Sequence, residues 1–406
     1  MRAHERTLLA PKRDASARRP LLLALAAGVL MVGGSAAGYR AILVGGADSA
    51  PPEMASAADW TDFKSAYGKR YETADLEAAA RSNFEDRLAA MAEANRANGA
   101  AVFGVTEHAD RPAGANARAR GRRPRVQGAV TKPSARRVAL DEADLAAVRG
   151  AAKDWRADSR GVIGAVKNQG QCGSCWAFAA TEQIEAQLVL AGAPQVELSA
   201  QQVASCATEE EGCCDGCGGG DVAAAYEYIA GAEGLAPEAF WPYSQSLTPD
   251  SQCLGLECTE SCDRDVSQLP ADYEFVGPYA KVMKYGYATE PCEVGACENQ
   301  NVVELAARVL ESPVAVCLNA GSFDDYVGGV ISEAACGGYS AMDVDHCVQL
   351  VGVNTTAEQP HWIIRNSWSP SWGENGYARL AYTETTNPCG IANEATVVRV
   401  REGRGL

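Results

Sequence analysis

The chain has 406 residues, a formal net charge of -16 and 15 cysteines. That length has room for an N-terminal leader, a regulatory segment and one folded domain of about 250 residues, which is large enough to bury a substantial core. The arginine-rich stretch at residues 115–137 has no interleaved aromatic side chains, so we expect no nucleic-acid partner.

The N-terminus has the composition of a targeting segment. Six Lys and Arg residues precede an apolar stretch from Leu21 to about Gly38, and this order of charge and apolarity is typical of a signal for the endoplasmic reticulum. The unbroken apolar run is about 18 residues long, near the lower limit for a membrane span. We expect residues 1–48 to be a signal peptide or a signal anchor, with cleavage or later release favoured over a retained membrane anchor.

A helical pattern begins at Trp60. Trp60, Phe63 and Tyr67 recur at helical spacing, and residues 77–95 continue as an amphipathic helix. We expect a helical segment at residues 55–112, acting either as a regulatory segment or as a generic spacer.

A change of composition and charge marks a boundary near Gly150. Residues 115–137 are rich in Arg, Ala, Gly and Pro, which is typical of a solvated, cleavable linker. We expect this linker at 113–149, before a folded domain at 150–406. From Gly150 onward 13 Lys and Arg stand against 35 Asp and Glu, a net charge of -22, which leaves +6 for the preceding part. Attraction between the two parts would weaken as carboxylates protonate, which predicts release in acid. The alternative is that the acidic charge serves solubility alone.

The stretch from Lys167 to Phe178 reads K-N-Q-G-Q-C-G-S-C-W-A-F and carries the clearest chemical signal. It puts Cys175 where a helix is predicted to begin, because residues 176–187 contain neither Gly nor Pro. A thiol at the positive end of a helix dipole is favoured as thiolate, which is the nucleophilic form. The alternative is a buried structural cysteine or half of a disulfide.

A nucleophilic cysteine needs a general base, and the chain has four histidines. His4 and His108 lie in the parts expected to be removed, which leaves His346 and His361. His346 stands at the start of the apolar run 347–353, a predicted buried strand. His361 is expected at the exposed end of another strand. We therefore expect His346 to be the base.

These motifs resemble those of the papain family, and specifically its cathepsin-like endopeptidases. The string C-G-S-C-W matches the family's nucleophile motif, N-S-W and G-E-N-G-Y match its downstream block, and residues 103–110 resemble a strand motif of its pro-region. The resemblance implies an α+β fold of two lobes, one helical and one β-barrel-like, with the active-site cleft between them. It also implies a zymogen with an inhibitory pro-region at 55–112, protein or peptide substrates, no cofactor and no metal.

The resemblance assigns roles to the catalytic positions. Cys175 would attack the peptide with His346 as its acid and base. Asn366 would orient the imidazole, Gln169 would donate to the oxyanion, and Trp368 would shield the His-Asn hydrogen bond from water. The same acyl-enzyme would serve a transferase or ligase, which no residue excludes. A catalytically silent binding protein would lack one of these groups.

The resemblance also implies substrate-binding positions, namely Gly219, Gly220, Val222, Cys317, Val344, Cys347, Trp368 and Glu394. Glu394 matches the floor of the S2 pocket, which receives the substrate's second residue before the cleaved bond, P2. An ionised carboxylate there would pair with a guanidinium, so the pocket would take Arg as well as Leu or Phe. The alternative is that Glu394 turns to solvent.

All 15 cysteines lie between Cys172 and Cys389, and removing Cys175 leaves an even number, as a disulfide framework requires. By resemblance we pair Cys172 with Cys217, Cys336 with Cys389, and Cys206 with one of Cys253, Cys258 or Cys262, leaving the other two for Cys213 and Cys214. Cys292 and Cys297 are expected to close a local loop, and Cys317 and Cys347 to bridge adjacent strands. Zinc is the alternative for C-C-D-G-C.

Asn354-Thr355-Thr356 is a sequon for N-glycosylation. Together with the leader and the cysteine content, it predicts a protein of the secretory route, in a lysosome or vacuole or outside the cell.

Overall fold

The computed structural model describes residues 59–114, 119–122, 141–207, 214–232, 234–244, 282–292, 295–297 and 300–400. All of them belong to one compact unit. The apolar segment from Leu21 to Gly38, expected to be a signal, lies outside these ranges. Among the helices within them, none is both long and apolar enough to cross a bilayer.

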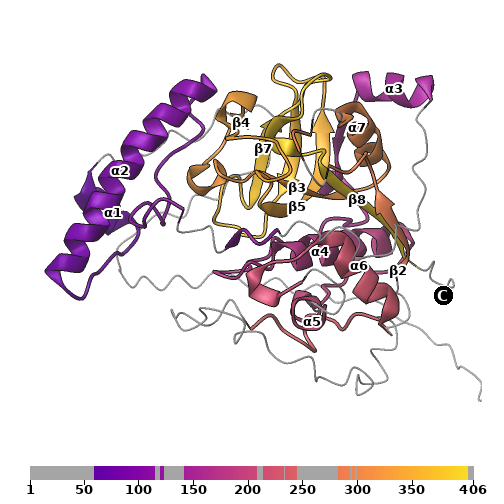
Figure 1. The fold of residues 1–406 in the computed structure, drawn as a ribbon, viewed down its shortest axis with the longest axis horizontal. Coiled ribbons are helices and arrows are strands. Elements are labelled where there is room, and N and C mark those ends of the chain that lie inside the picture. The colour runs from indigo at the N-terminus through magenta and orange to yellow at the C-terminus, as the bar shows by residue number, and fades with distance from the viewer. Residues whose placement is uncertain are drawn as a thin grey trace, which may run out of the picture. The chain divides into compact units, whose positions relative to one another are not determined.

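Two helices form the N-terminal part of the described chain (Figure 1). They are α1 (Trp60–Ala66) and α2 (Ala74–Asn98). Their apolar faces meet in an aromatic cluster, where the Phe84 ring centroid lies 5.6 Å from that of Trp60 and 4.7 Å from that of Phe63. Such ring pairs add to the stabilisation that burial itself provides. The predicted helical segment is present, and its core is aromatic.

A mostly antiparallel sheet forms the second part of the molecule. Its strands in spatial order are β2 (Val282–Tyr287), β8 (Glu394–Val400), β3 (Val314–Leu318), β5 (His346–Asn354), β6 (His361–Arg365), β7 (Tyr377–Ala381) and β4 (Val330–Ile331), and β1 (Ala152–Asp154) pairs with β5. Only β4 and β7 pair in parallel among these strands. The central strand β5 is buried from its first residue to Val353, as its apolar sequence requires.

Helices cover one side of this sheet. They are α4 (Cys175–Leu190), α5 (Ala200–Cys206) and α6 (Val222–Gly231). α4 packs against the other two helices and also against β5 and β8, and 14 of its 16 residues are buried. Because it is buried on all sides and contacts both groups of elements, α4 joins the helical lobe to the sheet lobe.

The expected linker is partly structured. α3 (Glu142–Arg149) begins at Asp141, whose carboxylate accepts hydrogen bonds from two backbone N–H groups of the first turn in a capping box. Val148 is fully buried, and α3 packs against α7 (Val302–Glu311). Short 3-10 helices lie at Trp155–Ala157, Gly216–Gly218, Phe323–Asp325, Glu333–Ala335 and Pro388–Gly390.

Candidate active site

Cys175 lies at the start of the buried helix α4. It is the first residue of that helix, its side chain is fully buried, and among the described cysteines it is the free thiol. A disulfide between Cys172 and Cys217, with Cα atoms 4.6 Å apart, fixes the loop that precedes the helix. The positive end of the helix dipole therefore faces the thiol, which favours its ionised form.

The imidazole of His346 is hydrogen-bonded to the side-chain amide of Asn366. His346 is the first residue of β5, and its Nε2 lies 2.8 Å from the Asn366 Oδ1. The Trp368 ring lies 4.8 Å from the imidazole between centroids. Within the described residues, the other imidazole nitrogen, Nδ1, is buried without a hydrogen-bond partner. The backbone N–H of the next residue, Cys347, lies close enough to the Cys175 sulfur to lower the pKa of the thiol, so β5 brings the imidazole near the thiol.

The other candidate base, His361, is engaged elsewhere. It begins β6 and is buried rather than exposed as expected. Its Nδ1 lies 2.7 Å from the carbonyl oxygen of Gln359. Of the two histidines, His346 is the one that the fold brings next to Cys175.

Gln169 holds its side-chain amide in a fixed, buried position. Its Oε1 accepts from the Ser367 hydroxyl at 2.5 Å. Its Nε2 donates to the Cys172 carbonyl at 2.8 Å and to the Ala119 carbonyl at 2.7 Å. The second acceptor belongs to the segment before the domain at 150–406, so that segment occupies the Gln169 amide.

Residues 119–122 run through the cleft over the thiol. The Gly121 backbone N–H donates to the Cys175 Sγ at 3.3 Å, and its carbonyl accepts from the Gly220 N–H at 2.8 Å. A Cβ on Gly121 would lie 1.8 Å from the Gly173 carbonyl oxygen, so only glycine fits. Arg122 pairs with Gly220 in a parallel bridge. Residues 119–122 of the expected linker are thus bound to the domain that follows, through backbone hydrogen bonds and one isolated bridge, which their composition did not predict.

Burial under this segment keeps the thiol and the imidazole uncharged. Desolvation raises the pKa of Cys175 to about 11. Desolvation also lowers the pKa of His346 to about 4, although its hydrogen bond to Asn366 acts in the opposite direction. Near neutral pH the covered pair is therefore thiol and neutral imidazole.

The positions implied as walls of S2 lie together. Val222, Cys317, Val344 and Cys347 are buried in one apolar cluster, and a disulfide joins Cys317 to Cys347 across β3 and β5. Glu394 begins β8 directly opposite Cys317. Its side chain is 7% exposed, so it does not turn to solvent.

Arg122 reaches this buried carboxylate. Its Nε donates to Glu394 Oε2 at 2.9 Å, its Nη2 pairs with the other carboxylate oxygen, and its Nη1 donates to the Ala341 carbonyl at 2.8 Å. The guanidinium is bound on all three nitrogens and its side chain is 1% exposed. Sequence reasoning missed Arg122 and Ala341, because the first lies in an arginine-rich stretch and the second carries no functional group.

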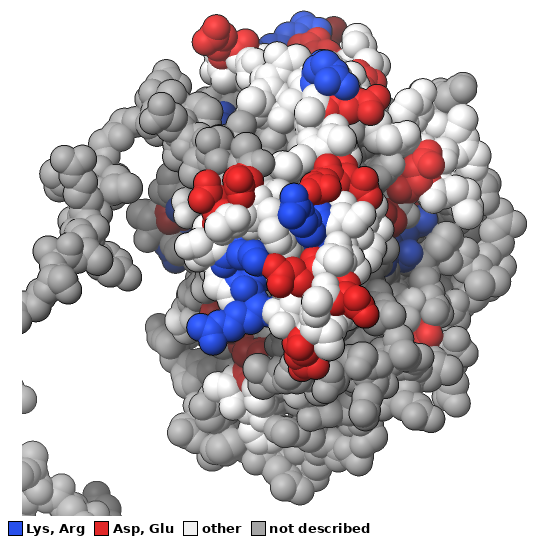
Figure 2. Space-filling view, turned by 90° about the vertical axis from the view of Figure 1, so that its left-hand side faces the viewer, with Lys and Arg blue, Asp and Glu red and all other residues white. Residues whose placement is uncertain are grey.

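Two further arginines bind acidic residues of the C-terminal part. Arg87 pairs with Asp325 and lies 3.9 Å from Asp324, and Arg120 lies 3.3 Å from Asp345. The positive charge expected of the whole pro-region is not carried by its helices. Residues 59–112 have 7 Lys and Arg against 10 Asp and Glu, and both signs are intermingled on the face of α1 and α2 (Figure 2). Attraction is therefore local to a few buried arginines.

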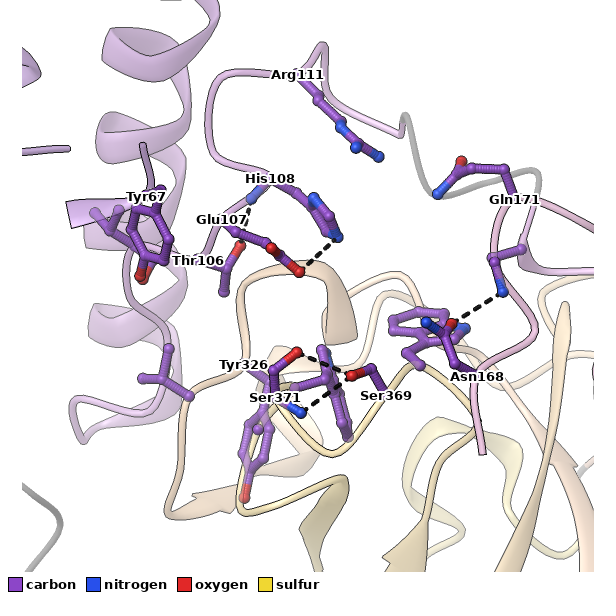
Figure 3. Close-up of a pocket in the computed structure, with 17 residues that line it drawn as sticks. Tyr67, Thr106, Glu107, His108, Arg111, Asn168, Gln171, Tyr326, Ser369 and Ser371 are labelled. Atoms are coloured by element: carbon purple, nitrogen blue, oxygen red, sulfur yellow. Dashed lines mark hydrogen bonds and ion pairs between the residues drawn. The ribbon is translucent and has the colours of Figure 1, made fainter. Parts of the chain in front are cut away.

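A cavity of about 510 Å³ lies between the N-terminal segment and the catalytic domain (Figure 3). His108 and Arg111 line one wall, and Asn168 and Trp368 line the other. Within the described residues His108 Nδ1 is buried without a hydrogen-bond partner. Burial, followed by the charge of Arg111, lowers the pKa of His108.

The described disulfides are Cys172–Cys217, Cys292–Cys297, Cys317–Cys347 and Cys336–Cys389, and these are the pairs expected from the sequence. Cys206 and Cys214 are also disulfide-bonded. The cysteines expected to pair with them, Cys253, Cys258 and Cys262, lie outside the described residues, as does Cys213. Because Cys214 and Cys217 are both in disulfides, neither is available to hold zinc.

Residues 150–399 match the sequence model of a family described as "Papain family cysteine protease". Cysteine proteinase B of Leishmania mexicana is 33% identical over 393 residues, which cover 95% of this chain and 76% of that protein. Cysteine proteinase 1 of Zea mays is 28% identical over 376 residues, with 88% and 90% covered.

Solved precursor structures share the fold. Digestive procathepsin L 3 from the larval midgut of Tenebrio molitor has a TM-score of 0.60 and 27% identity, over 84% of this chain and 97% of that one. A recombinant stem bromelain precursor has a TM-score of 0.62 and 25% identity, over 84% and 97%. The similarity therefore extends beyond the catalytic domain into the segment that precedes it.

Proposed function

This chain belongs to the papain family of cysteine proteases, and we propose that Cys175 is its nucleophile and His346 its acid and base. It is a cysteine endopeptidase made as a zymogen. The observation that carries the assignment of the site is the segment at residues 119–122, whose backbone bonds both to the Cys175 sulfur and to the Gln169 amide.

Removal of that segment starts the reaction. Water then reaches the thiol and the imidazole, the cost of charging them falls, and a proton passes from Cys175 to His346. The thiolate attacks the peptide carbonyl carbon, and the negative charge on its oxygen is held by Gln169 Nε2 and the Cys175 backbone N–H. His346 gives its proton to the leaving amine as the C–N bond breaks.

The second half of the cycle releases the acyl group. His346, now neutral, takes a proton from water, whose oxygen attacks the thioester carbon. The C–S bond then breaks, which releases the carboxylic acid and restores the Cys175 thiolate beside the His346 imidazolium. Asn366 keeps the imidazole oriented throughout, because its Oδ1 bonds to Nε2 and leaves Nδ1 for proton transfer. Trp368 covers that bond and so keeps water from competing for it.

We propose that acid triggers activation, and His108 supports this. Its imidazole lies among Glu107, Arg111, Lys69 and Asp110. Because burial lowers its pKa in the docked segment, the docked state binds fewer protons than the free state, where the pKa is about 6.5. His108 therefore contributes its full stabilisation to docking above about pH 6.5, and this stabilisation is lost as the pH falls below that value.

We propose that S2 accepts Arg at P2, with Glu394 as its floor and with Val222, Cys317, Val344 and Cys347 as its walls. The Arg122 guanidinium supports this, because it is already paired with the Glu394 carboxylate in the precursor. Gly219 and Gly220 would hold the substrate backbone, since Gly220 already donates to Gly121.

We also propose that residues 1–48 direct the chain into the secretory route, to a lysosome, vacuole or the outside, and that residues 55–112 are the inhibitory pro-region. Glycosylation at Asn354 would accord with this. The four described disulfides support an oxidising destination. Whether residues 1–48 are cleaved or anchor the precursor is decided by comparing the N-termini of the secreted and membrane fractions.

The experiment is peptide hydrolysis by the purified precursor after incubation between about pH 4 and 7, which spans carboxylate and His titration, beside a Cys175→Ala precursor. Activity that appears on acidification and is absent from the variant supports the proposal. Activity in the variant would exclude Cys175 as nucleophile. Adding an amine nucleophile and analysing the products separates hydrolysis from peptide transfer.

A further inference from the structure

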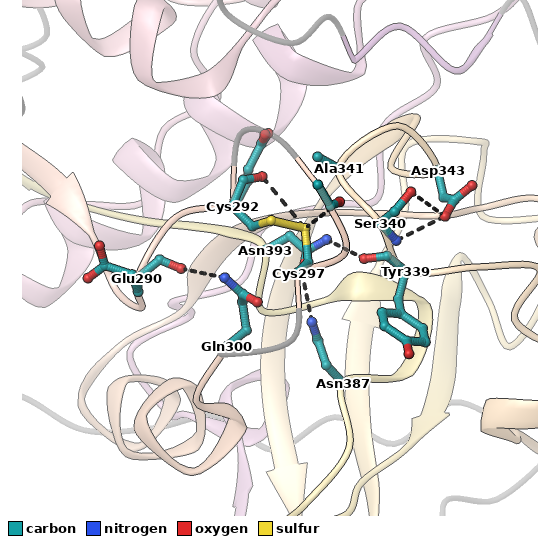
Figure 4. Close-up of a disulfide and its surroundings, with 12 residues drawn as sticks. Glu290, Cys292, Cys297, Gln300, Tyr339, Ser340, Ala341, Asp343, Asn387 and Asn393 are labelled. Carbon is teal, nitrogen blue, oxygen red and sulfur yellow. Dashed lines mark hydrogen bonds between the residues drawn. A yellow bond between two sulfur atoms is a disulfide. The ribbon is translucent and has the colours of Figure 1, made fainter.

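The Cys292–Cys297 disulfide lies beside Ala341 (Figure 4), whose carbonyl accepts a hydrogen bond from the Arg122 guanidinium. Its two cysteines form one buried apolar cluster with Ala341, which is 1% exposed. Ala341 also donates its backbone N–H to the Gly295 carbonyl at 3.1 Å, so the disulfide loop contacts it through both side chain and backbone. We call the disulfide together with the Gly295 carbonyl the clasp.

The clasp holds both groups that bind Arg122. Through Ala341 it fixes a carbonyl that accepts from Nη1 at 2.8 Å. Through the Cys292 N–H, which donates to the Asn393 carbonyl at 2.9 Å, it ties down the residue just before Glu394. Asn393 is itself 1% exposed, and its Nδ2 donates to the Tyr339 carbonyl at 2.7 Å. The two acceptors, far apart in sequence, therefore share one covalently closed support.

Ala341 depends on this support because no regular element holds it. It lies in the connection between β4 and β5, outside any helix or strand. A closed loop of a few residues has little conformational freedom to lose, whereas an open one must be ordered at each binding event. Opening the disulfide would let the Gly295 carbonyl move, and the Ala341 peptide would move with it because its N–H is bonded to that carbonyl.

We propose that the Cys292–Cys297 disulfide is a positioning element of S2 that makes the pocket selective for Arg at P2 over both Lys and Leu. This rests on the proposed role of Glu394. The carboxylate takes Nε and Nη2 of a guanidinium side-on, and the Ala341 carbonyl takes Nη1. A lysine ammonium is a single nitrogen and does not span both acceptors, while the planar fork of Arg does.

The test compares activated enzymes made from full-length precursors. A Cys292→Ser/Cys297→Ser double variant is assayed with matched fluorogenic peptides that carry Arg, Lys or Leu at P2. We expect kcat/KM for the Arg peptide to fall about tenfold, as for loss of one hydrogen bond to a charged group, mainly through KM. Hydrolysis of the Leu peptide should change less than about twofold, and the preference for Arg over Lys should shrink.

Two results would overturn the proposal: unchanged ratios among the three peptides, or an equal loss on all of them, which would indicate a purely structural disulfide. If the double variant does not fold, a Gly295→Ala variant tests the same proposal. Gly295 has a φ of +89°, which residues with a side chain rarely adopt, and a Cβ there meets nothing within 4 Å. The substitution should therefore shift the Gly295 carbonyl without a clash, while the disulfide remains. The same loss of Arg preference is expected, and unchanged ratios would overturn the proposal.

Glu394→Gln separates this inference from the proposed function. If Glu394→Gln lowers the Arg-to-Leu ratio and the clasp variants do not, S2 has its acidic floor and only the clasp is refuted. If Glu394→Gln leaves that ratio unchanged, the assignment of Glu394 fails, and the clasp proposal fails with it.

Discussion

Single residues of the bound segment block distinct parts of the active site. Gly121 lies over the sulfur, Ala119 occupies the Gln169 amide, and Arg122 binds Glu394. The bridge between Arg122 and Gly220 is parallel. The segment therefore occupies hydrogen-bonding groups around Cys175 at several points along its length.

Gly121 is the residue of this segment whose size matters most. Because a Cβ would clash with the Gly173 carbonyl at 1.8 Å, a Gly121→Leu precursor cannot keep residues 119–122 over the thiol. We expect it to hydrolyse peptides at neutral pH without acid treatment, at a rate about tenfold or more above the parent precursor. A Gly114→Leu precursor is the control, since nothing lies within 4 Å of its Cβ position, although its φ, unlike that of Gly121, is positive. Equal activity of the two variants would contradict this reading.

Gln169 gives a second prediction at the residue scale. Gln169→Ala removes one oxyanion donor, so in the activated enzyme we expect kcat to fall about a hundredfold or more, with little change in KM. Steady-state kinetics on a Leu peptide measures this. A rise in KM at constant kcat would show that Gln169 binds substrate and transition state equally.

At the scale of elements, the sequence predicted those helices and strands whose formation depends on neighbouring residues in the chain. The helix after Cys175 has no Gly or Pro, and the strand after His346 is continuously apolar, so both elements were expected. Family motifs added Gln169 and Asn366. Residues 119–122 were not predicted, since their order comes from partners such as Glu394, 272 residues away. α3 was missed because its alanine-rich sequence resembles the linker around it.

The docking of α2 on the catalytic domain depends on Arg87. This side chain is 7% exposed and pairs with Asp325, whereas Arg81 on the same helix is 59% exposed and pairs with Glu85. Breaking a buried pair leaves an uncompensated charge, while an exposed i,i+4 pair contributes little. We expect Arg87→Ala precursor to self-process faster at neutral pH and Arg81→Ala to match the parent. Gel analysis over time distinguishes them, and equal rates would refute the role of Arg87.

At the scale of the whole molecule, we expect the docking of the pro-region on the catalytic domain to depend on pH. Because the pKa of His108 is lowered by burial in the docked state, protonation favours release as the pH falls below about 6.5. A His108→Gln precursor lacks this charge and should show a smaller increase in activation rate between about pH 7 and 5 than the parent. A Glu107→Gln precursor controls for the loss of a neighbouring polar group. An unchanged pH profile in His108→Gln would assign the acid response to other groups.

The central claim is that the pro-region covers a nucleophilic thiol that becomes reactive on its removal. Labelling with a thiol alkylating agent, followed by peptide mass analysis, tests it most directly. We predict that Cys175 is protected in the precursor at neutral pH, is alkylated after acid activation, and that peptidase activity falls in proportion to its labelling. Equal labelling of Cys175 before and after activation, or full activity in alkylated enzyme, would contradict the account.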